Sequence, residues 1–373
     1  MAFDSPGDSI ERLHINDFCE LVGGTLHNID PNHPASPPLY HKPLPTALDS
    51  RGHETADSKA AKAARAELEL NWEQNKASSW PYTRPWVCDL GPRYNATVVS
   101  VFAWGMEDYE EIYQSEDFFH GPSTFIDRFH NITLPLLRNV AEWLGRPQVA
   151  HPTVVEVSSG FWDLRGLTEM DFLSRGINRP YPMDSDLPFG PIGEERERTW
   201  TRHAGEMLRA VAAALPGPTG AVRDGPVISW RTLHQPKRNN YTPYSRVFAL
   251  DQLARKLIHD LRSASLLQHP NLYKSALAAV SKTKTALLVK AGQAGVGAGW
   301  LAEAEAAGVA DEVDYGFDER LRVNEIGKLL TGQDNHFKDF LHPNPVPGSF
   351  LWGEIILYEL KRAVAGAGRS AHH

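Results

Sequence analysis

Residues 97–104 read TVVSVFAW, and short apolar runs rich in β-branched residues recur at 153–159 (TVVEVSS) and 226–232 (PVISWRT). Runs of this kind are typical of strands that are buried on both faces of a sheet. Helical patterns lie between and after them, at 135–145, 201–215 and 248–262. Strands that alternate with helices of this length predict βαβ units, so we expect an α/β fold with a central parallel sheet.

Outside this alternating region the sequence shows two kinds of pattern. Residues 9–22 carry a helical stripe that Gly23 and Gly24 end, and residues 58–76 have strong helix propensity. Residues 28–57 are rich in Pro, His and Ser and are typical of a long loop.

The overall composition suits one large folded domain. The 373 residues are 42% hydrophobic and 23% charged, which allows a sizeable core. A net charge of -8 argues against nucleic acid as a partner. No apolar run approaches the roughly 18 residues of a membrane span, and the first residues lack the basic and apolar regions of a signal peptide. We expect a single domain over 1–365 and a flexible tail over 366–373.

The stretch 265–315 is the hardest part of the chain to interpret. Within it, Gly297 to Ala302 match the pattern G-x-G-x-x-A of dinucleotide-binding loops, and Asp318 or Glu319 would serve as the acidic residue about twenty positions later. The motif belongs in a first βαβ unit, however, and here it stands late in the chain. We therefore favour an insertion at 265–315 and expect no cofactor.

Cys19 and Cys88 are the two cysteines of the chain. They form either one disulfide or two buried thiols, and two residues do not decide between these states. Three N-x-[ST] sequons begin at Asn95, Asn131 and Asn240. Sequons of this kind give a weak indication of the secretory route.

The residues that suggest chemistry stand at opposite ends of the chain. Asp339 and His342 are three residues apart in KDFLHPN, a spacing at which a carboxylate can orient an imidazole that then deprotonates a hydroxyl. Ser9 stands at the start of the first predicted helix, where N–H groups and the helix dipole stabilise an oxyanion. Alone, Ser9 is an ordinary N-cap and the other two an ordinary surface pair. Together, in an α/β pattern, they favour a Ser-His-Asp triad.

Four stretches in order along the chain resemble the SGNH (GDSL-type) hydrolase superfamily, and in particular its Pmr5/Cas1p-type branch of PC-esterases and trichome-birefringence-like polysaccharide O-acetyltransferases. They are GDSIERLHINDFCELVGG (7–24), VVEVSSGFWDL (154–164), VISWRTLHQPK (227–237) and DFLHPNPVPGSFLWGEIILYEL (339–360). The second is similar to the branch motif NSGxWDL, the third to VFxRTxSP and the last to the closing D-x-x-H block. The resemblance spans nearly the whole chain.

The resemblance implies a three-layer SGNH-type (flavodoxin-like) sandwich with large loop insertions. It also implies acyl ester chemistry, either as an esterase or as an O-acetyltransferase, with an acyl donor and a carbohydrate or other hydroxylated acceptor as partners. Ser9 matches the nucleophile, His342 the general base and Asp339 the acid that orients it. The family works in the secretory pathway or outside the cell, and in that compartment we expect Cys19 and Cys88 to be bridged.

One departure from the family concerns the oxyanion hole. The superfamily's third block carries an asparagine, whose place falls on Ser158 in the branch motif and on Trp162 in the wider pattern, and residues 151–170 contain no asparagine. The remaining donors are the Ser9 N–H group, Gly105 and Arg231, although Arg231 is equally well placed to be a structural ion-pair partner. The missing asparagine favours the alternative of a non-catalytic binding or structural protein with this fold.

A second departure concerns the first strand. In this fold the nucleophile follows a central parallel strand, but only residues 1–6 precede Gly7, and Pro6 suits a strand badly. We therefore expect most of this strand to be missing, which leaves its neighbours at 97–104 and 153–159 without ladder partners. A short strand over Ala2 to Ser5 is the alternative.

Four tryptophans stand close to these motifs: Trp104, Trp162, Trp230 and Trp352. Aromatic rings near a site suit a cleft in which sugars stack. Large aromatic side chains more often fill the core, however, and we expect this of most of the four.

Overall fold

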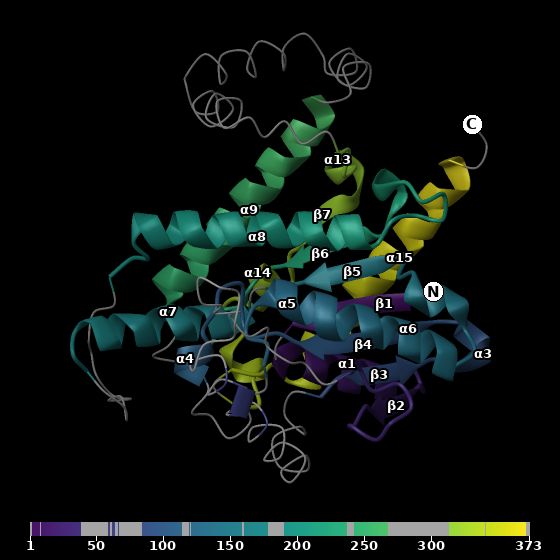
Figure 1. Ribbon diagram of the computed structural model, residues 1–373, viewed down its shortest axis with the longest axis horizontal. Coiled ribbons are helices and arrows are strands. Elements are labelled where there is room, and N and C mark those ends of the chain that lie inside the picture. The colour runs from purple at the N-terminus through teal and green to yellow at the C-terminus, as the bar shows by residue number, and fades with distance from the viewer. Residues whose placement is uncertain are drawn as a thin grey trace.

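The computed structural model describes residues 2–7, 9–38, 59, 62–63, 66, 84–113, 119, 121–158, 160–177, 190–236, 242–267, 313–339 and 341–370. Within these ranges seven strands form one sheet, with helices packed around it (Figure 1). The strands are β1 (Ala2–Gly7), β2 (Thr25–Asn28), β3 (Trp86–Asp89), β4 (Thr97–Phe102), β5 (Val154–Val157), β6 (Val227–Arg231) and β7 (Leu321–Asn324).

The spatial order of the strands is β2-β3-β4-β1-β5-β6-β7. The run from β4 to β7 is parallel throughout, and the β2–β3 hairpin pairs with β4 in the antiparallel sense. If the parallel strands are numbered along the chain, their order in space is 2-1-3-4-5, which is a doubly wound arrangement. The predicted α/β class with a parallel sheet is therefore confirmed.

The first strand is present at the centre of the sheet, so our expectation that most of it is missing is wrong. β1 runs through Pro6 to Gly7 and pairs with β4 along its whole length. It pairs with β5 only at Phe3 and Asp4. Pro6 has no N–H to donate, and it lies beyond the part of β1 that pairs with β5. The neighbours of β1 are the two strands that the sequence indicated.

Helices of ten or more residues pack around the sheet: α1 (Ser9–Leu21), α6 (Leu134–Trp143), α7 (Gly160–Ser174), α8 (Glu194–Ala214), α9 (Tyr244–Leu267) and α15 (Phe350–Ser370). Shorter turns connect them: α3 (Gly91–Tyr94), α4 (Glu110–Tyr113), α5 (Phe125–Arg128), η1 (Phe129–Thr133), η2 (Pro147–Ala150), η3 (Val222–Asp224), α13 (Phe317–Arg320), α14 (Ile326–Leu330), η4 (Asp334–His336) and η5 (Pro345–Ser349).

Side chains that alternate along the strands build a separate core on each face of the sheet. On one face, three valines of β4, β5 and β6 pack with α1 and α15: Val98, Val154 and Val227. On the other face, the next residues of the same strands pack with α6, α8 and α9: Val99, Val155 and Ile228. Successive strand residues point to opposite faces, so both faces of the sheet carry apolar side chains. Helices cover both faces and bury these side chains (Figure 1).

A disulfide joins α1 to β3. The Sγ atoms of Cys19 and Cys88 are 2.08 Å apart and the Cα atoms 5.8 Å apart. The bridge expected from the resemblance is therefore confirmed, and the alternative of two buried thiols is wrong. Gly24 lies against it, since a Cβ atom at this position would be 2.9 Å from both sulfurs.

Some of the other predictions fall on residues that the structure does not describe, and the rest can be compared with it. The predicted helix at 58–76 lies almost wholly outside the described residues, and the G-x-G-x-x-A motif at 297–302 lies wholly outside them. Asp318, which we considered as the acidic residue of a dinucleotide-binding site, binds Arg223 and Ser265 instead. The last helix, α15, extends to Ser370, into the stretch where we expected a flexible tail. Among the described residues no helix has the length and apolar character needed to cross a membrane.

Candidate functional site

Four of the predicted site residues follow the carboxyl ends of neighbouring parallel strands. Ser9 begins α1 directly after β1, Gly105 follows β4, Ser158 follows β5 and Arg231 ends β6. The strand order reverses between β1 and β5, and ligands of open α/β sheets bind at the carboxyl edge beside such a point. The topology therefore gathers these residues at one edge of the sheet.

The position of Ser9 is described for its backbone alone. It is the first residue of α1, while its side chain and the whole of Asp8 lie outside the description. The hydrogen bond between Ser9 and His342 therefore stays a prediction.

Asp339 and His342 form the side-by-side pair that their spacing predicts. The His342 Nδ1–H group donates to Asp339 Oδ2 at 2.8 Å. The other carboxylate oxygen, Oδ1, accepts the backbone N–H groups of Leu341 at 2.8 Å and of His342 at 2.7 Å. Partial burial raises the pKa of Asp339. The hydrogen bonds from these N–H groups and from the ring lower it by a larger amount, so the pKa lies below its usual value. The carboxylate therefore stays ionised and keeps the proton of His342 on Nδ1.

His234 fixes the loop that carries this pair. Its Nε2 lies 2.8 Å from the carbonyl oxygen of Leu341, to which it must donate because a carbonyl only accepts. The ring is buried, with its centroid 5.0 Å from that of Phe161 and 5.2 Å from that of Phe337. The segment after β6 thus anchors the residue that precedes His342.

Arg231 lies in a buried ion pair with Glu11 of α1, and both side chains are fully buried. It also donates through Nη2 to Ser158 Oγ at 3.2 Å, and the same oxygen accepts the N–H group of Gly160 at 3.2 Å. Of the two roles that the sequence left open for Arg231, the structure shows the ion pair. Arg231 thereby ties the first turn of α1 to β6 and to the end of β5.

These contacts connect the start of α1 with the loop of His342. Glu11 is two residues from Ser9 and binds Arg231, and His234, three residues beyond Arg231, holds Leu341. A second link joins the same two segments farther along, because the Ser349 hydroxyl donates to Asp17 Oδ2 at 2.7 Å. The start of α1 and the loop of His342 are therefore held at one region of the carboxyl edge. Sequence reasoning did not single out Glu11 or His234 as site residues. The only sequence signal for them is that they lie inside the motifs at 7–24 and 227–237.

Gly105 lies where the chain turns sharply after β4, with φ +127, and a Cβ atom there would be 2.5 Å from Asp163 Oδ1. That buried carboxylate accepts the N–H group of Met106 at 2.9 Å and the Trp200 Nε1–H group at 3.2 Å. Asp163 thus holds the loop in which Gly105 lies. A role of Gly105 in an oxyanion hole stays a prediction.

Three of the four tryptophans near the motifs fill the core, as expected: Trp104, Trp230 and Trp352. Trp162 is only partly buried, and the Arg165 guanidinium lies 5.1 Å from its ring centroid. A stacking role near the site therefore remains open to Trp162 alone among the four.

His14 is a buried residue of α1 that sequence reasoning did not single out. Neither ring nitrogen has a hydrogen-bond partner among the described residues, and the ring centroid lies 5.6 Å from that of Trp352. Burial lowers the pKa of His14 well below its usual value, and the positive charge of Arg231 adds to this effect. His14 is therefore a neutral imidazole beside the candidate site.

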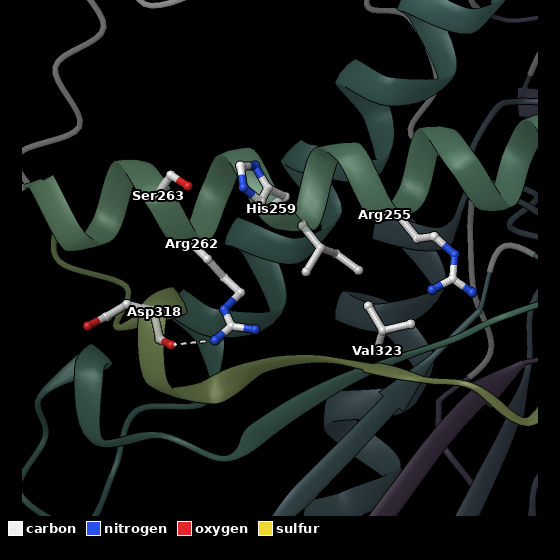
Figure 2. A pocket seen from close by; sticks show the side chains of 7 residues that line it. Arg255, His259, Arg262, Ser263, Asp318 and Val323 are labelled. Atoms are coloured by element: carbon white, nitrogen blue, oxygen red, sulfur yellow. Dashed lines mark hydrogen bonds between the residues drawn. The ribbon is translucent and has the colours of Figure 1, made fainter. Parts of the chain in front are cut away.

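Two pockets lie along α9. One, of about 650 Å³, opens between the segment after β6, the first half of α9 and α14. The other, of about 440 Å³, lies between α9 and β7, where Arg255 and Arg262 point from the helix towards the strand (Figure 2). Arg255 pairs with Glu325, and Arg262 donates to the Asp318 carbonyl oxygen, so hydrogen bonds hold both guanidinium groups. In the described residues no group of three His, Cys, Asp or Glu side chains is arranged to hold a metal ion.

Comparisons of the chain with models of protein families, with curated proteins and with solved structures found no match.

Proposed function

We propose that this protein carries out serine-dependent acyl ester chemistry of the SGNH type on a carbohydrate or similar hydroxylated substrate. The observation that carries the proposal is the hydrogen bond between His342 Nδ1 and Asp339 Oδ2, on a loop tied to the sheet edge where Ser9 begins α1. The 2-1-3-4-5 order of the parallel strands, with helices on both faces, supports the flavodoxin-like sandwich that this assignment requires.

In the proposed reaction Ser9 is the nucleophile. His342 Nε2 takes the proton of the Ser9 hydroxyl as Oγ attacks the ester carbonyl, and it then protonates the departing alcohol, leaving an acyl group on Ser9. Water or a sugar hydroxyl next gives its proton to Nε2 and attacks the acyl carbon, and Ser9 leaves with that proton. Asp339 stabilises the imidazolium that forms in both steps.

We assign the developing oxyanion to the N–H group of Ser9, at the positive end of α1, with the N–H group of Gly105 as the second donor. The Arg231 guanidinium already pairs with Glu11 and donates to Ser158. We therefore assign Arg231 and Ser158 a positioning role, in which they hold the first turn of α1 against the ends of β5 and β6.

Turnover of p-nitrophenyl acetate tests the proposal. The wild-type chain should release p-nitrophenol, and Ser9→Ala should lower kcat/KM by at least about 10³-fold. Ser174→Ala, an exposed serine on α7, is the matched control and should leave the rate unchanged. Absence of turnover in the wild type would support the alternative of a non-catalytic binding protein, whereas full activity in Ser9→Ala would contradict the assignment of Ser9 as the nucleophile. An added oligosaccharide that becomes acetylated would identify a transferase, and acetate release alone an esterase.

A further inference from the structure

We propose that the pocket between the segment after β6, the first half of α9 and α14 is a subsite for a neutral glycan chain. Its role, holding the sugar whose ester is made or cleaved, rests on the proposed function. The pocket has a volume of about 650 Å³, within the usual range for small-molecule sites. Its lining combines the aromatic side chains of Tyr244 and Phe248 with the amides of Gln235 and Gln252 and the hydroxyl of Thr331.

The first argument is a pair of exposed aromatic rings at the pocket. Tyr244 and Phe248 lie one turn apart on α9 and are 58% and 52% exposed. Their ring centroids are 6.2 Å apart and the rings are inclined by 27°. Large apolar side chains that gather on a surface beside a pocket mark a binding site. The negative face of an aromatic ring attracts the polarised C–H groups of a sugar ring, so such a pair suits a glycan.

The second argument is an unsatisfied polar atom in the lining. The side-chain oxygen of Gln235, Oε1, is buried and has no hydrogen-bond partner in the described part of the chain. Its Nε2–H group donates to the carbonyl oxygen of Pro236 at 3.1 Å. Because a buried acceptor without a donor is destabilising, a ligand hydroxyl at this position would satisfy it. Gln252 and Thr331 add further groups that both donate and accept.

The third argument is the balance of charge, which favours a neutral ligand over a phosphate or an acidic peptide. Arg255 donates to Glu325 through both terminal nitrogens, so its charge is compensated. Asp251 and Lys328, one acidic and one basic, line the same pocket. The lining therefore offers no excess of one sign, and the groups that remain are hydroxyl, amide and aromatic.

The position of the pocket suits a chain of sugars rather than one ring. Arg255 also lines the pocket of Figure 2, so the two pockets adjoin along α9. From Tyr244 to Arg262 the helix rises about 27 Å, at about 1.5 Å per residue. The lining also includes Leu233, which precedes His234 in the chain, and His234 holds the loop of His342. A bound glycan would therefore extend towards the proposed catalytic centre.

Titration calorimetry with cellohexaose, xylohexaose and mannohexaose tests the subsite without relying on turnover. The wild-type chain should bind at least one of the three, and the double variant Tyr244→Ala/Phe248→Ala should raise that Kd about tenfold or more. Both side chains are more than half exposed, so the variant should fold, which circular dichroism would check. Tyr358→Ala, a 57% exposed tyrosine on α15, is the matched control and should bind like the wild type.

The two proposals fail separately. If the wild type hydrolyses p-nitrophenyl acetate but binds none of the hexasaccharides, or if the double variant binds as tightly as the wild type, the subsite is wrong and the proposed function stands. If the double variant loses glycan binding in a protein without esterase activity, the subsite stands and the proposed function is wrong. Tighter binding of a phosphorylated peptide than of any hexasaccharide would also overturn the glycan assignment.

Discussion

At the scale of single residues, Asp339 uses both carboxylate oxygens on the loop that carries His342. Oδ2 accepts the imidazole Nδ1–H group, and Oδ1 accepts the backbone N–H groups of Leu341 and His342. One side chain therefore fixes both the tautomer of the ring and the turn that presents it. If His342 is the general base, its function depends on this carboxylate more than on any other group described near it.

Asp339→Asn should lower kcat/KM for p-nitrophenyl acetate by about 10²–10⁴-fold while the fold is kept. The amide oxygen can still accept the two backbone N–H groups, but the amide NH2 then faces Nδ1 and shifts the ring proton to Nε2. Steady-state kinetics would measure the loss. Asp334→Asn, an exposed residue of η4, should retain full activity, and equal losses in both variants would contradict the assignment.

Asp251 gives a prediction on pH. Burial raises the pKa of Asp251 to about 6, against the lowering effects of the Leu233 N–H group and of Arg255 and Arg231. The folded chain therefore holds this proton more tightly than the unfolded chain, whose carboxyl group keeps its ordinary lower pKa. The group's contribution to stability falls as the pH rises between these two values and is least favourable above about pH 6.

Asp251→Asn should accordingly raise the melting temperature at pH 7.5, because an amide has no charge to bury and can still accept the Leu233 N–H group. At pH 4.5 the gain should shrink, since the native carboxyl group is then mostly protonated. Thermal unfolding followed by circular dichroism at the two pH values would measure both effects. Glu354→Gln on the exposed face of α15 is the control, and a pH-independent effect of Asp251→Asn would contradict the account.

The residues of the candidate site differ in how visible they are in the sequence. Asp339 and His342 are neighbours along the chain, so their spacing alone predicts the pair. The Glu11–Arg231 ion pair and the bond from His234 to Leu341 join segments that are far apart in sequence. Such contacts depend on how the strands are ordered, which one sequence does not encode in any local spacing.

At the scale of elements, strand prediction worked best for buried strands that carry an apolar, β-branched run. The three apolar runs became β4, β5 and β6, which are buried at every position described. β2 (TLHN) and β7 (LRVN) are four-residue edge strands with mixed polarity, and they lack the apolar run that reveals a central strand. The prediction for β1 was wrong because we took Pro6 as evidence against a strand. One sequence does not show that β1 pairs with β5 only at residues before Pro6.

The disulfide between α1 and β3 should contribute strongly to stability. Cys19 and Cys88 are separated by 69 positions, so the bridge closes a long loop in the unfolded chain. Cys19→Ser/Cys88→Ser should lower the free energy of unfolding by about 2–4 kcal/mol. Denaturant unfolding of this variant would measure the loss, and 1 mM dithiothreitol should shift the wild type but not the variant. An unchanged midpoint in the variant would contradict a structural role for the bridge.

At the scale of the whole molecule, the first and last described helices pack together on one face of the sheet. The rings of Phe18 and Trp352 meet edge to face at 5.7 Å, and a Cβ atom at Gly353 would be 2.7 Å from the Phe18 ring. Trp352 also donates to the buried Glu156 of β5 at 2.8 Å. This packing brings the two terminal motifs, which are more than 300 positions apart in the sequence, to one region of the fold.

The central claim is that Ser9 is a nucleophile activated by His342. Labelling with a fluorophosphonate, followed by mass spectrometry of the tryptic peptide that ends at Arg12, tests it most directly. The account predicts one covalent adduct, placed by fragmentation on Ser9 rather than Ser5, absent from Ser9→Ala and formed at least about 10²-fold more slowly in His342→Gln. A wild-type chain that is not labelled, an adduct on another serine, or an unchanged labelling rate in His342→Gln would contradict it.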